Sequence, residues 1–166
     1  MGEISIDPKF NIHETYKKMR ILNPYRNDSP IGAAELVVNG NFENNINGWT
    51  SYYNSQDTEI SWDNGTIKLV QNDSRMADAY QGVSIEPGKE YEIRIVARTN
   101  GIGRGRVYLG SDNTANYRYG IINFYSEVDT EKSINIVAGQ IVYIKLRTEG
   151  SGNIFNVNSV SLREVI

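Results

Sequence analysis

The aromatic residues of this sequence, together with nearby polar residues, are its first candidates for ligand binding. The chain contains eleven tyrosines and two tryptophans. Sugar rings expose C–H faces that pack on aromatic rings, while polar side chains hydrogen-bond the hydroxyl groups. Tyr117 and Tyr119 fall on one face of an expected strand, and with Trp62 they are the first candidates for a ligand platform. Arg75 and Arg98 are the expected polar partners.

The same aromatic residues also have a purely structural interpretation. Tyrosine and tryptophan are enriched in β-strands because they pack well on a pleated surface. For any single aromatic residue, a place in the core or at its rim is therefore the simpler explanation. Further candidates that face the same choice are Tyr52, Tyr53, Tyr80, Tyr108 and Tyr125.

The sequence shows no clear combination of residues that would form a catalytic site. There is no cysteine, which excludes disulfides, thiolate metal sites and a cysteine nucleophile, and the single histidine is His13. The acidic residues are scattered, and no two stand out as the carboxylate pair of a glycoside hydrolase. The glycine-rich stretch at 101–106 resembles a phosphate loop, but a strand is expected to follow it where that mechanism needs a helix. We therefore expect no enzyme activity.

Charge and hydropathy exclude two further classes of protein. The net charge is −3 and charges of both signs are interleaved, whereas nucleic-acid-binding domains carry a basic face. No run approaches the roughly 18 apolar residues that a membrane-spanning helix needs. The first 30 residues show no signal-peptide pattern, so we expect either that one was removed or that the protein reaches its site without one.

From residue 36 onward, the sequence predicts β-strands, and these carry the candidate residues. Residues 91–98 alternate apolar and polar, as in a half-buried strand. Residues 59–70 predict a hairpin around Asn64-Gly65, because this pair tolerates positive φ. Further strands are expected near 80–85, 106–110, 117–124, 132–137, 141–147 and 153–162. Short strands at regular spacing predict an all-β fold, an antiparallel sandwich.

The first 34 residues differ from the rest and predict an N-terminal arm. Asp7-Pro8 can cap and begin a helix, and Asn23-Pro24 ends the pattern. A helix of about 14 residues is marginal alone in water, so its apolar residues should pack either on their own domain or on another protein chain. The residues expected to dock are Phe10, Ile12, Tyr16 and Met19.

Three stretches carry a resemblance to a known family. They are ELVVNGNFENNINGWT at 35–50, PGKEYEIRIVAR at 87–98 and FNVNSVSLREV at 155–165. In order and spacing, residues 35–166 resemble carbohydrate-binding modules of the family 4/9 type. The resemblance implies a jelly-roll β-sandwich and glycans as ligands. It also suggests an interpretation of the first stretch: residues 36–38 form the first strand, Phe42 enters the core, and Trp49 closes one end of the sandwich.

The resemblance also implies a structural calcium ion between the first and last strands. The family ligands include the glutamate of the Asn-Gly-x-Phe-Glu motif and an aspartate in the last strand. Glu43 matches the first, but Asn158 and Ser159 stand where the acidic residue is expected. Because Ca²⁺ prefers carboxylate oxygens, the site is expected to be weak or lost.

Two functional hypotheses follow from this organisation. The first is an accessory protein of a phage virion (capsid decoration, head fibre or tail attachment), anchored by residues 1–34 and presenting the sandwich at the virion surface. The alternative is a glycan-binding module of a secreted, polysaccharide-degrading enzyme, located outside the cell.

Overall fold

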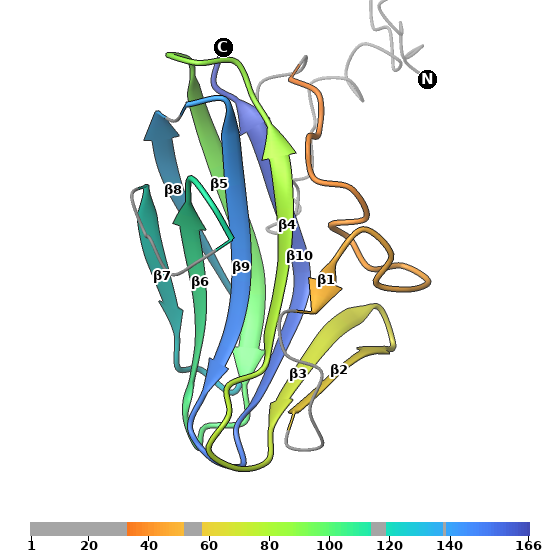
Figure 1. The fold of residues 1–166 in the computed structure, drawn as a ribbon. Helices are drawn as coiled ribbons and strands as arrows, with labels where there is room; N and C mark the ends of the chain where they lie inside the picture. Colours follow the sequence, from red (N-terminus) through yellow and green to blue (C-terminus); the bar gives the residue numbers. More distant parts are fainter. Residues whose placement is uncertain (1–32, 52–57, 114–118, 138) are drawn as a thin grey trace, which may run out of the picture.

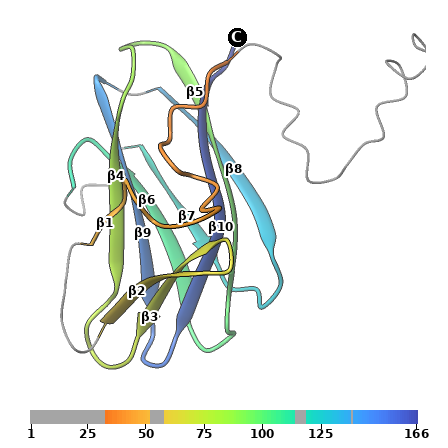
Figure 2. The same cartoon turned by 90° about the vertical axis from the view of Figure 1, so that its right-hand side faces the viewer.

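The protein folds into a sandwich of two antiparallel sheets. The computed structural model describes residues 33–51, 58–113, 119–137 and 139–166. Sheet A contains, in spatial order, β1 (Thr50–Ser51), β4 (Asp78–Ser84), β9 (Ile141–Glu149), β6 (Arg104–Gly110) and β7 (Gly120–Phe124). Sheet B contains β2 (Thr58–Asp63), β3 (Thr66–Gln71), β10 (Ile154–Glu164), β5 (Glu90–Thr99) and β8 (Thr130–Val137). The two layers face each other in Figures 1 and 2, so the prediction of an all-β antiparallel sandwich is confirmed.

The hydrophobic core lies between the sheets, and strand alternation explains why. On β5, Tyr91, Ile93, Ile95 and Ala97 are buried, while the residues between them are half-buried on the other side. Neighbouring β10 contributes Phe155, Val157, Val160 and Leu162, and a bulge between Val157 and Ser159 keeps its apolar residues facing inward. Sheet A supplies the opposite wall, including Val107, Leu109, Ile144 and Leu146.

The predicted hairpin is present. Strands β2 and β3 pair from Thr58↔Gln71 to Asp63↔Thr66. Asn64 and Gly65 connect them with φ of 46° and 83°, the left-handed backbone that asparagine and glycine tolerate best.

The expected first strand at 36–38 is wrong. These residues form no strand, because most of their backbone N–H groups are taken by side chains. The Glu35 carboxylate accepts from the amides of Leu36 and Val37, and Gln81 Oε1 accepts from Val38. The segment touches the last strand through one backbone bond, from Leu36 N to Leu162 O at 3.1 Å. The first strand of the described chain is therefore β1, at Thr50.

The rest of this stretch behaves as predicted. Phe42 is fully buried and Trp49 nearly so, with their ring centroids 5.6 Å apart. The predicted N-terminal helix and its docking residues lie outside the described residues. No helix in the described ranges is long and apolar enough to cross a membrane.

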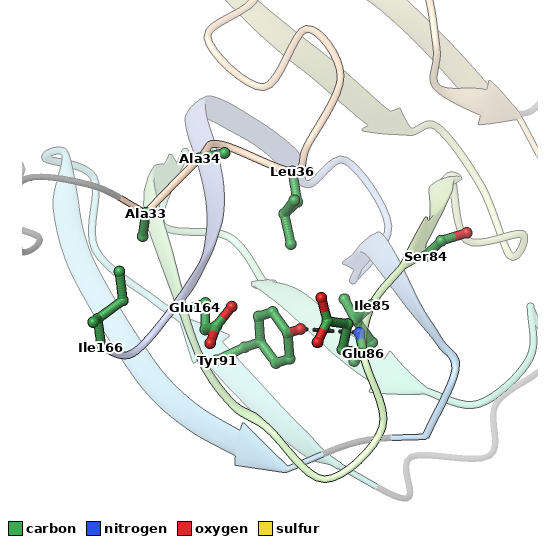
Figure 3. Close-up of a pocket in the computed structure, with 9 residues that line it drawn as sticks. All are labelled: Ala33, Ala34, Leu36, Ser84, Ile85, Glu86, Tyr91, Glu164 and Ile166. Carbon is green, nitrogen blue, oxygen red and sulfur yellow. Dashed lines mark hydrogen bonds between the residues drawn. The ribbon is translucent and has the colours of Figure 1, made fainter.

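One end of the sandwich, called the terminal pole here, contains a pocket of about 420 Å³ (Figure 3). Residues 33–36 enter the fold at this pole and the chain ends there at Ile166. The Tyr91 hydroxyl accepts a hydrogen bond from Glu86 N at 2.9 Å, and Lys89 pairs with Glu86 and Glu164 at 2.9 and 3.0 Å. These polar groups are therefore paired with one another by hydrogen bonds and ion pairs.

Candidate functional site

The outward-facing side chains of sheet A form rows across its strands. Directly paired residues of an antiparallel sheet share a face, and the residues between them are buried in the core. One row contains Tyr80, Lys145, Tyr108 and Ile121; the next contains Asp78, Arg147, Arg106 and Asn123; a third contains Glu149 and Arg104. This surface, together with Tyr143 on β9, is called the outer face of sheet A below.

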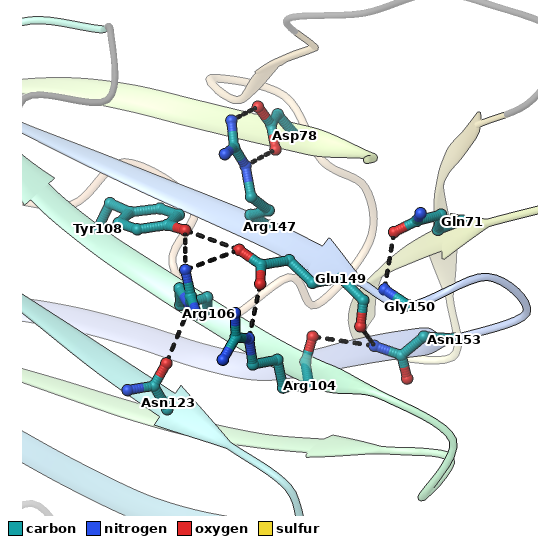
Figure 4. A network of polar contacts seen from close by, with 10 residues as sticks. All are labelled: Gln71, Asp78, Arg104, Arg106, Tyr108, Asn123, Arg147, Glu149, Gly150 and Asn153. Atoms are coloured by element: carbon teal, nitrogen blue, oxygen red, sulfur yellow. Dashed lines mark hydrogen bonds and ion pairs between the residues drawn. The ribbon is translucent and has the colours of Figure 1, made fainter. Parts of the chain in front are cut away.

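A bidentate ion pair fixes one part of this face. Arg147 donates from Nε and Nη2 to the two carboxylate oxygens of Asp78, each at 2.6 Å (Figure 4). Asp78 is fully buried and the Arg147 side chain is 15% exposed. The paired carboxylate raises the pKa of the guanidinium above its ordinary value, although burial acts against this. The two parallel hydrogen bonds therefore hold both side chains in a single geometry.

A second cluster centres on Glu149. Its Oε1 accepts from the Tyr108 hydroxyl at 2.8 Å and pairs with Arg106 Nη1 at 2.9 Å, and its Oε2 accepts from Arg104 Nε at 2.6 Å. Burial alone would raise the pKa of Glu149, but the hydrogen bonds from Tyr108 and Arg104 outweigh it and lower the pKa. The carboxylate therefore stays ionised and orients three donors.

Tyr108 connects the two clusters. Its hydroxyl accepts from Arg106 Nη1 at 2.7 Å while donating to Glu149. The guanidinium carbons of Arg106 and Arg147 lie 5.5 and 5.2 Å from its ring centroid, within cation–π range. Burial raises the pKa of Tyr108, which Arg106 only partly offsets, so the phenol remains a neutral donor.

Lys145 lies between Tyr80 and Tyr108 in the first row and is almost fully buried. Burial lowers the pKa of its ammonium group, and the negative charge of Asp78 opposes that change. Lys145 and Asp78 are thus two buried ionisable groups in the middle of the face.

Tyr143 and Tyr80 form the aromatic part of the face. Their ring centroids are 6.4 Å apart. Tyr143 is paired with Gly82 on β4, and a Cβ built on Gly82 would lie 3.0 Å from Cε1 of Tyr143. The ring therefore lies over the glycine, against the sheet. Both tyrosines are half-buried, so each also keeps part of its surface open.

This arrangement suits recognition better than bond cleavage. Both carboxylates of the face, Asp78 and Glu149, are occupied by guanidinium groups, whereas glycoside hydrolysis needs one carboxyl group free to act on a proton. Oriented N–H and O–H groups beside tyrosine rings match the hydroxyl groups and C–H faces of a sugar.

The structure does not bring the predicted ligand residues together. Trp62 lies on β2 and Arg98 on the outer side of sheet B, where it pairs with Asp129 at 3.1 Å. Arg75 is exposed in the loop after β3. Tyr119 packs against the core, and its hydroxyl accepts from Gly139 N at 3.2 Å. Tyr117 lies outside the described residues.

Tyr80 and Tyr108 were among the residues singled out in the sequence, whereas Tyr143 and the charged network were not. A signal for them lies in strands β6 and β9. In 104–110 and 141–149, aliphatic or small residues alternate with tyrosine and charged residues, which gives each strand one core side and one polar, aromatic side.

The residues expected to bind calcium do not form a ligand set. Asn41 donates to Glu43 at 2.8 Å, and Asn158 donates to Asp129 at 2.9 Å. Within the described ranges, no group of three or more histidine, cysteine, aspartate or glutamate residues is placed to hold a metal ion. These contacts do not fit Ca²⁺, which takes six to eight oxygen ligands.

Comparison with known proteins supports the same kind of function. The profile of the family described as "Carbohydrate binding domain", of the 4/9 type, matches residues 34–141, more than half of the chain. A search of curated proteins finds no match.

Solved structures share the fold at low sequence identity. The N-terminal cellulose-binding domain of Cellulomonas fimi β-1,4-glucanase C aligns with a TM-score of 0.59 and 14% identity, over 80% of this chain and 99% of that one. TmCBM61, solved with β-1,4-galactotriose, aligns at 0.59 and 10%, over 78% and 97%. Tailspike protein 4 of bacteriophage CBA120 aligns at 0.58 and 16%, over 79% of this chain and 21% of its own.

Proposed function

Because this chain belongs to the carbohydrate binding domain family, we propose that the outer face of sheet A binds a glycan without altering it covalently. The observation that carries the proposal is the pair Tyr143 and Tyr80, lying beside a hydrogen-bonded network of charged side chains. The tyrosines supply surface for the C–H faces of sugar rings. Arg104, Arg106 and Asn123 supply hydrogen-bonding groups whose positions are already fixed.

A fixed network favours binding because little conformational entropy remains to be lost. Expected dissociation constants lie between about 1 mM and 10 μM, equivalent to roughly 4–7 kcal/mol. Both carboxylates of the rows are paired with arginines, so we expect the polar groups of this face to meet the hydroxyl groups of neutral sugars.

The biological setting we propose is a phage virion, in which the protein is an accessory surface component. Residues 1–34 would anchor it to another protein of the particle through Phe10, Ile12, Tyr16 and Met19. The sandwich would then be displayed outward. Support comes from the contrast in sequence between this arm and the rest of the chain. The presence of the same fold in a phage tailspike is compatible with this setting.

The alternative is a module of a secreted enzyme that degrades polysaccharides. The observation that favours it is the likeness to a cellulose-binding domain of a β-1,4-glucanase. In that setting, residues 1–34 would be a linker to another domain, and the same outer face would hold the enzyme on its substrate.

A glycan array tests the shared part of both settings. The full chain should bind at least one neutral oligosaccharide, and Tyr143→Ala should reduce that binding about tenfold. An absence of binding, or equal binding by the variant, would remove the proposal.

Truncation separates the two settings. A protein lacking residues 1–32 keeps the Glu35 contacts and should bind glycans as the full chain does. The virion proposal predicts that, when phage particles assemble in cells that produce this truncated protein, the purified particles do not contain it. Equal retention with and without the arm would contradict an anchoring role.

A further inference from the structure

Trp62 is an exposed tryptophan whose orientation is fixed. The residue is 42% exposed, whereas Trp49, the other tryptophan, is 8% exposed. Its indole Nε1–H donates to the backbone carbonyl of Phe42 at 2.7 Å. Because this bond satisfies the polar end of the side chain, the open part of the ring is presented to solvent in one orientation.

The carbonyl that holds Trp62 belongs to a rigid and strained loop. Phe42 has φ of 50°, a left-handed conformation that costs a bulky residue roughly 1–3 kcal/mol. Its side chain is fully buried. Gly40 O accepts from Val160 N at 2.7 Å, and a Cβ on Gly40 would overlap the Val160 carbonyl. The core and the last strand together therefore hold the loop in place.

Polar residues precede and follow Phe42 in the sequence. Asn41 and Glu43, on either side of Phe42, are exposed, and Asn41 Nδ2 donates to Glu43 Oε1 at 2.8 Å. Within the described ranges, Glu43 Oε2 has no further side-chain partner. A carboxylate beside an amide offers acceptors and donors to adjacent hydroxyl groups. With Trp62, which is held by the carbonyl of the intervening Phe42, this pair has the composition of a sugar subsite.

We propose that Trp62, Asn41 and Glu43 form a second glycan subsite, which stacks one neutral pyranose ring on the indole. The inference rests on the proposed function, since it assumes a glycan ligand, but it uses none of the residues of the first site. Trp62 lies on β2, the edge strand of sheet B, while the first site lies on the outer face of sheet A. Two sites on one module would raise its retention on a polysaccharide above that of either site alone.

The two tryptophans provide an internal control for the test. In a ¹⁵N-labelled full chain, the indole N–H signals of Trp62 and Trp49 are followed during titration with cellohexaose, xylohexaose, laminarihexaose and β-1,4-galactotriose. The proposal predicts that at least one of these sugars shifts the Trp62 signal and leaves Trp49 nearly unchanged. The shift should persist in Tyr143→Ala, in which the first site is impaired.

If none of the four sugars moves the Trp62 signal, the second subsite is overturned. If the parent protein still binds a sugar and Tyr143→Ala does not, the proposed function stands without the second subsite. If the parent binds none of them, both proposals fail together.

Variants distinguish two roles for Trp62: binding a sugar ring, or only covering the loop that contains Phe42. Glu43→Gln alters an exposed side chain and should leave the melting temperature unchanged, while lowering retention on an insoluble polysaccharide about threefold. Trp62→Ala should lower that retention about tenfold, with Trp62→Phe in between. If Trp62→Ala only lowers the melting temperature and Glu43→Gln has no effect on retention, Trp62 merely covers the loop.

Discussion

Two ion pairs, one on the outer side of each sheet, differ in how their charges are held. On sheet A, Asp78 is fully buried and bound in bidentate fashion by Arg147, which is itself largely covered. On sheet B, Arg98 and Asp129 form a pair whose side chains are 40% and 33% exposed. The tyrosines Tyr80, Tyr108 and Tyr143 all lie on sheet A.

The two pairs are expected to differ in how much they stabilise the fold. A charge in solvent contributes little and its side chain is free to move, whereas a buried, paired charge is fixed and costly to disturb. Fixed polar groups beside aromatic rings suit the recognition surface that we propose for sheet A.

The largest effect is expected from breaking the buried pair. Asp78→Asn leaves the Arg147 guanidinium buried without its counter-charge, so the free energy of unfolding should fall by about 3–5 kcal/mol. Urea denaturation monitored by circular dichroism measures this loss. The matched change on sheet B, Arg98→Ala, should cost less than about 1 kcal/mol. Similar losses for the two variants would contradict the contrast between the faces.

A smaller effect should follow from moving one ring. In Gly82→Ala, the added methyl group would approach the Tyr143 ring to about 3.0 Å, so the ring must shift away from the sheet. We expect glycan affinity to fall about three- to tenfold while stability changes by less than about 1.5 kcal/mol, the usual range for a modest packing change. Calorimetric titration and thermal melting report the two quantities. Unchanged affinity would mean that the position of this ring is unimportant for binding.

The stability that Glu149 contributes on sheet A should depend on pH. Burial acts to raise the pKa of Glu149, but the hydrogen bonds from Tyr108 and Arg104 lower it below its ordinary value. A lowered carboxyl pKa contributes stability that is present above the unfolded-state pKa, near 4.3, and is lost as pH falls through the folded-state value. The difference in unfolding free energy between the parent and Glu149→Gln should therefore shrink as pH falls below about 4.5. A constant difference from pH 7 to pH 3 would contradict this assignment.

The smallest effect is expected from calcium. The side chains of Glu43 and Asn158 are engaged with Asn41 and Asp129, respectively. After treatment with a chelator, addition of 1 mM Ca²⁺ should therefore shift the melting temperature by less than about 1 °C, because a ligand stabilises only in proportion to its binding. A clear heat of binding together with a shift of several degrees would instead establish a calcium site.

Much of the fold could be predicted because its signals are local. Alternation in 91–98, the Asn64-Gly65 turn and the buried pair Phe42 and Trp49 each depend on residues close together in the sequence. The expected strand at 36–38 was wrong because distant or flanking side chains, Gln81 and Glu35, take its backbone donors. Apolar sequence alone does not reveal such partners.

The candidate site was harder to predict because it depends on strand register. Asp78 and Arg147 are 69 residues apart in sequence, so they belong to no local motif. They meet only because β4 pairs with β9. Arg98 has a plausible sequence context for ligand binding, yet strand order places it on the other sheet from Tyr143. Residue types suggested the chemistry, but the pairing of the strands decided which residues share a face.

A bound glycan can be mapped through the tyrosine ring signals of the full chain. During titration with an oligosaccharide that binds on the array, the ¹³C-labelled rings of the half-buried Tyr80 and Tyr143 should shift together. Tyr91, buried between the sheets on β5, should not. If binding leaves the rings of Tyr80 and Tyr143 unchanged, the outer face of sheet A is not the glycan site.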